Sequence, residues 1–476
     1  MSKASLNDFF EPRGIAIIGA SAKPGAPNNQ IVKFAIEESK GHDIQIYPIN
    51  PRTEEIEGLK AYRSILDIEG PVDLILMAVS SKMAMSVAEE VKRRRQERGD
   101  AGAVAIITAG FKEQGTEEGE RLQNEMIAVM TAAGSRVIGP NCQGVIDVHN
   151  GVNTTFSVTP GALKGGVSIV SQSGAFVAAF LRWAKKQNMV AMNKLITLGN
   201  MADVDVTEMV EFLAEDPQTK SISVYLEGTP NARKFIETAK KVTKKKPVVV
   251  IKAGRSEMGK NVAHSHTASV AGNDAIYDGA FRQAGILRAY SVDEFYHTGR
   301  VFDKMPVPKG DRVAILTVVG GPSTICVDAM ASRGQIRLAH FSEELKEKLR
   351  AVLSPFANVG SPDGYVDMTA SVTPQMHKEC IRYLMEDDSI DAILFITTPP
   401  GFMDETEFAN ALMEGYRSVD ESKRKPLLSV LLAGNASPVC RNILETNNFP
   451  TFEFPDTAAI CLSNMVRYRK YLDQED

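Results

Sequence analysis

Short apolar runs recur along this chain and alternate with longer amphipathic segments, and this alternation constrains the fold more than any other feature. The runs do not alternate apolar and polar residues strictly, so they predict strands that are covered on both faces. A strand followed by a helix, many times over, is typical of parallel sheets with helices on both sides. The predicted strands lie at residues 14–18, 44–49, 72–79, 103–108, 136–139, 166–170, 194–199, 222–228, 247–254, 312–319, 391–397 and 426–434.

The strand–helix pattern restarts twice, near residues 166 and 312. A chain of 476 residues has room for about three domains of ordinary size. We therefore expect an α/β protein of three consecutive parallel-sheet domains of the Rossmann or flavodoxin kind. Their expected limits are 1–150, 151–305 and 306–476, with linkers near 152–165 and 302–310, the second of which carries Pro306 and Pro308.

Composition excludes several classes of protein. The net charge is -5 and aromatic residues make up 7%, with Trp183 the single tryptophan, so neither charge nor stacking favours a nucleic acid as partner. No apolar run approaches the roughly 18 residues of a membrane helix. The N-terminus lacks the apolar core of a signal peptide. Scattered cysteines without a CxxC pair indicate a reducing compartment and no zinc site, so we expect a cytoplasmic protein. These are Cys142, Cys326, Cys380, Cys440 and Cys461.

The first candidate site is the glycine-rich segment GASAKPG, which follows the first strand and precedes a helix. Glycines let the backbone approach a phosphate, and the helix N-terminus offers N–H donors, although a tight turn alone would also explain them. A nicotinamide dinucleotide site would need an acidic residue where the second strand ends, but Asn50 stands there. The residues of the segment that we expect at a phosphate are Gly19, Ala20, Ser21, Lys23, Pro24 and Gly25.

The second candidate is SQSGA, which also follows a buried strand and opens a helix. Ser171, Gln172, Ser173 and Gly174 could form an anion cradle, or a serine N-cap beside a closely packed glycine. The segment resembles half of a hydrolase nucleophile elbow, but Ser171 stands where the first glycine would be needed. A hydrolase triad is therefore poorly supported.

The third candidate is HSHTASVAG, a small-residue loop that begins at His264 and follows the strand near 247–254. Its His-x-His pair could ligate a metal, yet no carboxylate or cysteine lies close by in sequence, so we predict no metal site. A neutral imidazole in this loop is a competent nucleophile toward phosphorus, especially when a carboxylate holds its other nitrogen. Glu227 ends a neighbouring strand and could be that carboxylate, or a satisfied loop anchor.

Two basic runs, KRRRQER (92–98) and KKVTKKK (240–246), each end a predicted helix. Cations at that position complement the helix dipole. We interpret both runs as solvated helix ends rather than as ligand sites.

At these motifs the chain resembles the α subunit of an NDP-forming acyl-CoA synthetase, the superfamily that includes ADP-forming acetyl-CoA synthetase and succinyl-CoA synthetase. The motifs follow one another in the family's order over nearly the whole chain and are most specific between residues 139 and 272. They are FFEPRGIAIIGAS, YPINP, TAGF, GPNCQGVI, SQSGA, LGNMADVD, YLEG and SHT.

The resemblance implies a role for each candidate. Coenzyme A would bind the first domain, with its nucleotide phosphates at the GASAKPG segment. His266 would carry a phosphoryl group, Glu227 would orient it, and the helix that opens at SQSG would stabilise the phosphohistidine. Phosphate would convert the acyl thioester to an acyl phosphate, and His266 would pass the phosphoryl group on to ADP. The rest of the coenzyme would be bordered by Asn50, Val79, Ser80, Thr108, Asn141 and Cys142.

The chain departs from the family pattern in two places. It reads SHTA, with Ala268, where SHTG is common, and SPDGYVD (361–367) where a shorter turn is usual. It also has neither room for a nucleotide-grasping domain nor a GxxxxGK[ST] loop. The resemblance therefore implies a separate ATP-grasp β subunit that binds ATP or ADP with Mg, in an α2β2 assembly, and a short-chain or functionalised carboxylic acid as substrate. The alternatives are a non-catalytic, coenzyme A-binding regulatory subunit and an NAD-dependent oxidoreductase.

Overall fold

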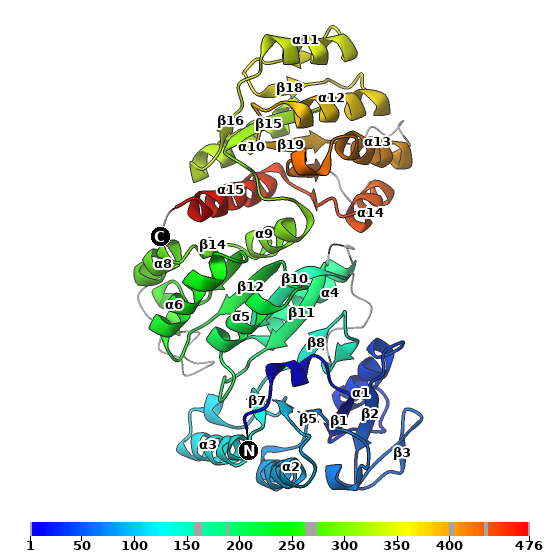
Figure 1. Cartoon of the computed structure of the whole chain (residues 1–476), viewed down its shortest axis with the longest axis vertical. Helices are drawn as coiled ribbons and strands as arrows, with labels where there is room; N and C mark the ends of the chain where they lie inside the picture. The colour runs from blue at the N-terminus through cyan, green and yellow to red at the C-terminus, as the bar shows by residue number, and fades with distance from the viewer. Residues whose placement is uncertain are drawn as a thin grey trace. The chain divides into compact units, whose positions relative to one another are not determined.

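The computed structural model describes residues 2–156, 164–186, 189, 191–261, 274–398, 404–432 and 437–474. The chain divides into two compact units, Met1–Arg288 and Ala289–Asp476, and each is described by itself (Figure 1). No described helix is both long enough and apolar enough to cross a membrane.

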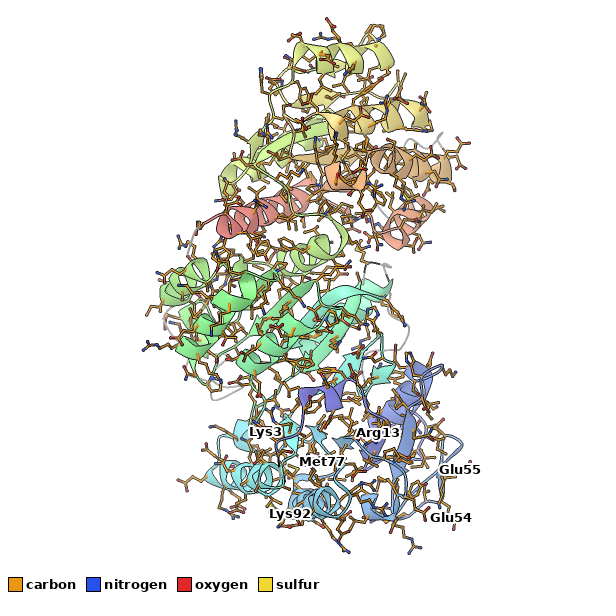
Figure 2. All side chains as sticks on the ribbon, viewed as in Figure 1. Lys3, Arg13, Glu54, Glu55, Met77 and Lys92 are labelled. Atoms are coloured by element: carbon orange, nitrogen blue, oxygen red, sulfur yellow. The ribbon has the colours of Figure 1, made fainter. Side chains whose placement is uncertain are left out.

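The first sheet of unit 1 is parallel throughout, with the strand order β2-β1-β5-β6-β7. All five residues of β1 are buried, as expected for a strand covered on both faces. Met77 of β5 is buried, whereas Glu54 and Glu55 are exposed (Figure 2). The elements are β1 (Gly14–Ile18), α1 (Pro27–Glu38), β2 (Gln45–Ile49), β5 (Leu74–Met77), α2 (Ala84–Arg98), β6 (Ala103–Ile106), α3 (Glu117–Ala132) and β7 (Arg136–Ile138).

The second sheet of unit 1 has the order β14-β13-β12-β10-β11-β8-β9. Strands β10 to β13 are parallel, while β8 and β9 form a hairpin that joins β11 antiparallel. The sequence pattern did not predict this hairpin, because its strands are only three and two residues long. The elements are β8 (Val145–Asp147), β9 (Val152–Asn153), β10 (Lys164–Ser171), α4 (Gly174–Lys186), β11 (Met192–Thr197), α5 (Val206–Glu215), β12 (Ser221–Leu226), α6 (Ala232–Thr243), β13 (Val248–Lys252), α8 (Asp274–Gln283) and β14 (Leu287–Ala289).

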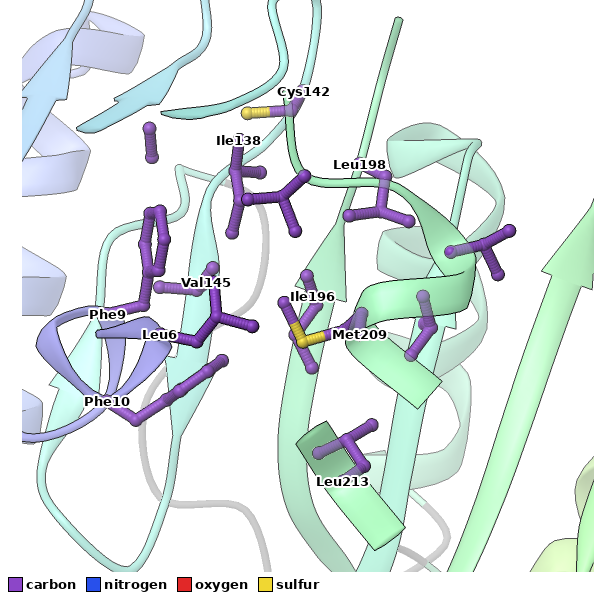
Figure 3. Packing of buried hydrophobic residues seen from close by; sticks show 14 of the residues in the cluster. Leu6, Phe9, Phe10, Ile138, Cys142, Val145, Ile196, Leu198, Met209 and Leu213 are labelled. Atoms are coloured by element: carbon purple, nitrogen blue, oxygen red, sulfur yellow. The ribbon is translucent and has the colours of Figure 1, made fainter. Parts of the chain in front are cut away.

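The two sheets of unit 1 share one hydrophobic core. The short N-terminal helix η1 (Leu6–Phe9) contributes Leu6 and Phe9 to a cluster that also contains Val145 and Met209 (Figure 3). The buried Arg136 of β7 adds ion pairs to Asp203, at 3.0 Å, and to Glu208, at 2.5 Å. These contacts join the amino end of β7, in the first sheet, to the segment after β11 and the first turn of α5.

Unit 2 has a third sheet, of order β17-β18-β15-β19-β20-β21 with β16 beside β15. Helices α9 and α10 each pack on α15, and α12 packs on α13. The SPDGYVD segment forms the turn between β17 and β18 and continues into β18. The elements are α9 (Val292–Lys304), β15 (Arg312–Thr317), α10 (Gly320–Arg333), β16 (Arg337–Leu338), α11 (Glu343–Val352), β17 (Asn358–Val359), β18 (Tyr365–Asp367), α12 (Pro374–Glu386), β19 (Ala392–Thr397), α13 (Glu405–Arg417), β20 (Leu427–Leu431), α14 (Pro438–Thr446), β21 (Thr451–Phe452) and α15 (Pro455–Leu472).

A buried charge cluster lies inside unit 2. The carboxylate of Glu445 pairs with Arg300 at 2.5 Å and with Lys304 at 2.7 Å, and it accepts hydrogen bonds from the N–H and hydroxyl of Thr451. Burial alone would raise the pKa of Glu445, but the two cations lower it to about 2. The cluster thus ties α9 to α14.

The structure corrects one sequence interpretation. The basic run 92–98 ends α2, as predicted, but Arg94 within it is fully buried rather than solvated. Its guanidinium pairs with Asp100 at 2.7 Å and donates to the carbonyl of Gly70 at 2.7 Å. A buried guanidinium needs several acceptors at once, and the chain preceding β5 supplies them.

Candidate active site

The turn from β1 into α1 is built for a close backbone approach. Gly19 has a φ of +89°, and a Cβ there would lie 2.5 Å from the carbonyl oxygen of Ala78. Asn28 donates from its side-chain nitrogen to the carbonyls of Gly19, at 2.7 Å, and Ala78, at 2.9 Å. No side chain caps the N-terminus of α1, and because Pro27 has no N–H, the N–H of Asn28 is the first that this end of the helix can offer an anion.

The other residues predicted to border coenzyme A follow the carboxyl edge of the same sheet. Asn50 donates to the carbonyl of Ala20 at 2.8 Å, and thereby holds the glycine-rich turn. The hydroxyl of Thr108 donates to the carbonyl of Val79, which lies beyond β5 next to Ser80. Asn141 in turn donates its N–H to the carbonyl of Thr108 at 3.0 Å. The structure therefore brings these predicted residues together at one edge.

We expect Gly19→Ala to weaken this edge selectively. A methyl group at positive φ, against the backbone at residue 78, must displace one of the two chains, at a cost of about 2 kcal/mol or more. Thermal denaturation should show a lower Tm and a smaller stabilisation by coenzyme A than in the wild type. Gly41→Ala is the control, because that glycine also has positive φ but no heavy atom lies within 4 Å of its added Cβ. Equal loss of coenzyme A stabilisation in both variants would contradict the assignment.

A cavity of about 750 Å³ opens between the carboxyl ends of the two sheets of unit 1. Its walls include Asn141 and Cys142 from the first sheet, Gln172 and Gly174 from the turn after β10, and Glu227 from the end of β12. Burial raises the pKa of the Cys142 thiol to about 11, so this thiol is protonated at neutral pH and is a poor nucleophile. Predicted site residues from three separate segments of the chain therefore line the same cavity.

The turn after β10 is fixed by its own side chains. The hydroxyl of Ser171 donates to the carbonyl of Ser173 at 2.7 Å and accepts from its N–H at 3.1 Å. The side-chain oxygen of Gln172 accepts from the N–H groups of Glu227, at 2.6 Å, and Gly228, at 3.0 Å. Two donors occupy that oxygen, and this fixes the orientation of the amide group. The amide nitrogen of Gln172 is the atom that can donate to a ligand. The second candidate segment thus holds the backbone of Glu227 directly.

A second network on the cavity wall was not predicted from sequence. The carboxylate of Glu113 accepts from the N–H groups of Gly110 and Phe111 and, at 2.6 Å, from the side chain of Asn200. Asn200 also donates to Gln123 at 2.9 Å. Burial opposes ionisation of Glu113, but these hydrogen bonds keep its pKa below the usual value. The TAGF and LGNMADVD motifs, both recognised in the sequence, meet at this network. The presence of both motifs in one sequence was the feature from which the network could have been predicted.

The third candidate segment lies outside the described residues. It comprises His264, His266 and Ala268, so the pairing of His266 with Glu227 stays a prediction. Glu227 is 9% exposed, and Tyr225 lies close to it. Burial first, and the nearby carboxylate second, raise the pKa of Tyr225 to about 12. Among the described residues, no group of three or more His, Cys, Asp or Glu side chains could hold a metal ion.

Comparison with known proteins agrees with this arrangement. Three family models match in succession: a CoA binding domain at residues 13–147, a succinyl-CoA ligase like flavodoxin domain at 164–302 and a ligase-CoA domain at 313–445. The chain is 40% identical over 469 residues to the acetate–CoA ligase [ADP-forming] II subunit alpha of Pyrococcus furiosus, covering 98% of each chain. It is 36% identical to the acetate–CoA ligase [ADP-forming] of Methanocaldococcus jannaschii, covering 98% of this chain and 63% of that one.

A solved structure extends the likeness to three dimensions. It is the Ca. Korarchaeum cryptofilum dinucleotide forming acetyl-coenzyme A synthetase 1 in complex with phosphate and ADP, with a TM-score of 0.88, 30% identity and 98% coverage of both chains. The chain belongs to the family of ADP-forming acyl-CoA ligases, over the part that forms their α subunits. The family predicted from the motifs and the predicted α/β fold are both confirmed.

Proposed function

We propose that this chain is the α subunit of an ADP-forming acyl-CoA synthetase, which converts a carboxylic acid, ATP and coenzyme A to acyl-CoA, ADP and phosphate. The observation that carries this proposal is the cavity of about 750 Å³, which joins the coenzyme A edge at Asn141 to the Gln172–Glu227 pair. Acetate is the default acid, because the relatives are named for it.

Coenzyme A would lie along the carboxyl edge of the first sheet. Its phosphates would meet the turn from Gly19 to Gly25 and the uncapped N-terminus of α1. The thiol end would pass Val79, Thr108 and Asn141 toward the cavity. The match of a CoA binding domain to residues 13–147 supports this assignment.

The reaction would proceed in two transfers on this chain. Phosphate attacks the thioester carbonyl, the carbon–sulfur bond breaks, and coenzyme A leaves with a proton while an acyl phosphate forms. A ring nitrogen of His266 then attacks phosphorus, and the carboxylate leaves with the bonding electrons. The N–H groups that open α4 and the amide of Gln172 would stabilise the phosphoryl oxygens, and Glu227 would hold the other imidazole nitrogen. This is mostly positioning and charge stabilisation.

A separate partner would supply the nucleotide. The M. jannaschii relative extends well beyond the part matched here, whereas the P. furiosus α subunit is covered over 98% of its length. These coverages support an ATP-grasp β subunit that binds ATP or ADP with Mg, in an α2β2 assembly. Three domains, at 1–150, 151–305 and 306–476, remain our proposed division of this chain.

The proposal predicts that this chain alone cleaves acetyl-CoA when arsenate replaces phosphate. An acyl arsenate hydrolyses spontaneously, so coenzyme A should be released over many turnovers without nucleotide or partner. Release is measured with a chromogenic thiol reagent, for which the five native cysteines give little background because all are buried.

The controls separate the alternatives. Omission of arsenate should stop release of the thiol. Stabilisation by coenzyme A without any release would instead indicate a binding subunit, and stabilisation by NADH alone would indicate an oxidoreductase.

A further inference from the structure

A buried lysine lies directly behind Glu227. Lys252 is the last residue of β13, is 4% exposed, and pairs in register with Leu226 of β12. Its ammonium donates to the carbonyl of Glu227 at 2.7 Å and to the carbonyl of Ala253 at 2.5 Å. The ring of Tyr277 lies 5.0 Å away. Two carbonyls and one aromatic face account for all three ammonium protons.

The surroundings of Lys252 make a charged ammonium there unfavourable in free energy. Burial, Arg288 and Lys260 all lower the pKa of Lys252, whereas Asp274 and Glu227 raise it. Asp274 is itself engaged by Arg288 at 2.5 Å. An apolar side chain would fill such a site at less cost. A buried ammonium kept there, beside the cavity, therefore suggests a use beyond packing.

The position of Lys252 indicates that use. Gln172 binds the N–H of Glu227 and Lys252 binds its carbonyl, so the backbone of Glu227 is held from two sides. Lys252 also binds the carbonyl of Ala253, where the segment that leads in sequence to His266 begins. One side chain thus fixes both strand ends from which the phosphoryl-transfer pair would be built.

We propose that Lys252 is a positioning residue for phosphoryl transfer: its ammonium sets the place of the Glu227 backbone, from which the carboxylate is presented. The inference rests on the function proposed above. The proposed role of Lys252 affects only the second of the two transfers, because the thioester step does not use Glu227. Loss of Lys252 should therefore slow formation of phosphohistidine and leave cleavage of acetyl-CoA by arsenate working.

The experiment follows both steps in the full chain. Radiolabelled inorganic phosphate with acetyl-CoA reports phosphohistidine, and arsenate with acetyl-CoA reports the thioester step. We expect Lys252→Met to lower the labelling rate about tenfold, as loss of a charged hydrogen bond would.

Two further variants and a measurement of Tm distinguish a positioning role of Lys252 from a structural one. Lys252→Arg restores a charged donor and should return the labelling rate toward wild type. Lys241→Met, on the exposed side of α6, should match wild type throughout. Normal labelling by Lys252→Met would overturn the proposal. A parallel loss of labelling, arsenate cleavage and Tm would also overturn it, because it would show a merely structural role. Absence of label in wild type would instead refute the proposed function.

Discussion

His266→Asn is expected to abolish labelling of this chain by inorganic phosphate and acetyl-CoA, with a rate at least about 10³-fold below wild type. Asparagine keeps a polar side chain of similar reach but offers no nucleophilic nitrogen, so no phosphoramidate can form. Cleavage of acetyl-CoA by arsenate should continue, because that step ends at the acyl arsenate. The label should be acid-labile and alkali-stable, and it is followed after rapid mixing and gel separation.

The neighbouring histidine provides the matched control. His264→Asn changes the same residue type two positions earlier in the chain and should retain the label. Label that survives in His266→Asn and disappears in His264→Asn would show that His264 is the phosphorylated residue. Label that survives in both variants would place the chemistry on another residue.

Glu445→Gln should produce a large loss of stability in unit 2. The substitution keeps the shape of the side chain but leaves Arg300 and Lys304 buried without their counter-charge. Removing one partner of a buried ion pair typically costs about 3–5 kcal/mol. For a unit of this size, that corresponds to a decrease of roughly 10 °C in the transition temperature of unit 2, which is followed by calorimetry. Glu344→Gln, on an exposed helix face, should change little.

The same carboxylate predicts a pH dependence. The pKa of Glu445 is about 2 in the folded chain, below the value of about 4.3 in an unfolded one. Its stabilisation is therefore complete above about pH 4.3, and it is lost as the pH falls toward 2. Wild type should lose about 3 kcal/mol more than Glu445→Gln across that interval. Equal acid sensitivity of the two proteins would contradict this account of the cluster.

Sequence reasoning succeeded where the relevant signal is local. The apolar runs located β1, β6 and β15 to within about two residues, because a strand buried on both faces must be apolar along its length. The turn at Gly19 was predicted for a similar reason, since positive φ and close approach select glycine within a few positions.

The rest depends on contacts between distant segments. Glu113 and Asn200 are 87 positions apart, and neither residue alone indicates a partner. Arg94 lies in a run of charges that reads as solvated, and only its acceptors before β5 show that it is buried. Lys252 ends an ordinary apolar strand, so its bond to Glu227 became visible only when β12 and β13 were placed in register.

The packing of the N-terminal segment has a consequence for synthesis of the chain. Leu6, Phe9 and Phe10 leave the ribosome well before α5, but they pack in one cluster with Met209 and Leu213, and the ring of Phe10 stacks on Phe212 at 5.3 Å. These apolar residues can contact β6 once the first sheet exists, but their contacts with α5 must wait for some 200 more residues. The first sheet can therefore form on the nascent chain with this segment only partly packed, and its packing on α5 becomes a late step that depends on completion of that helix.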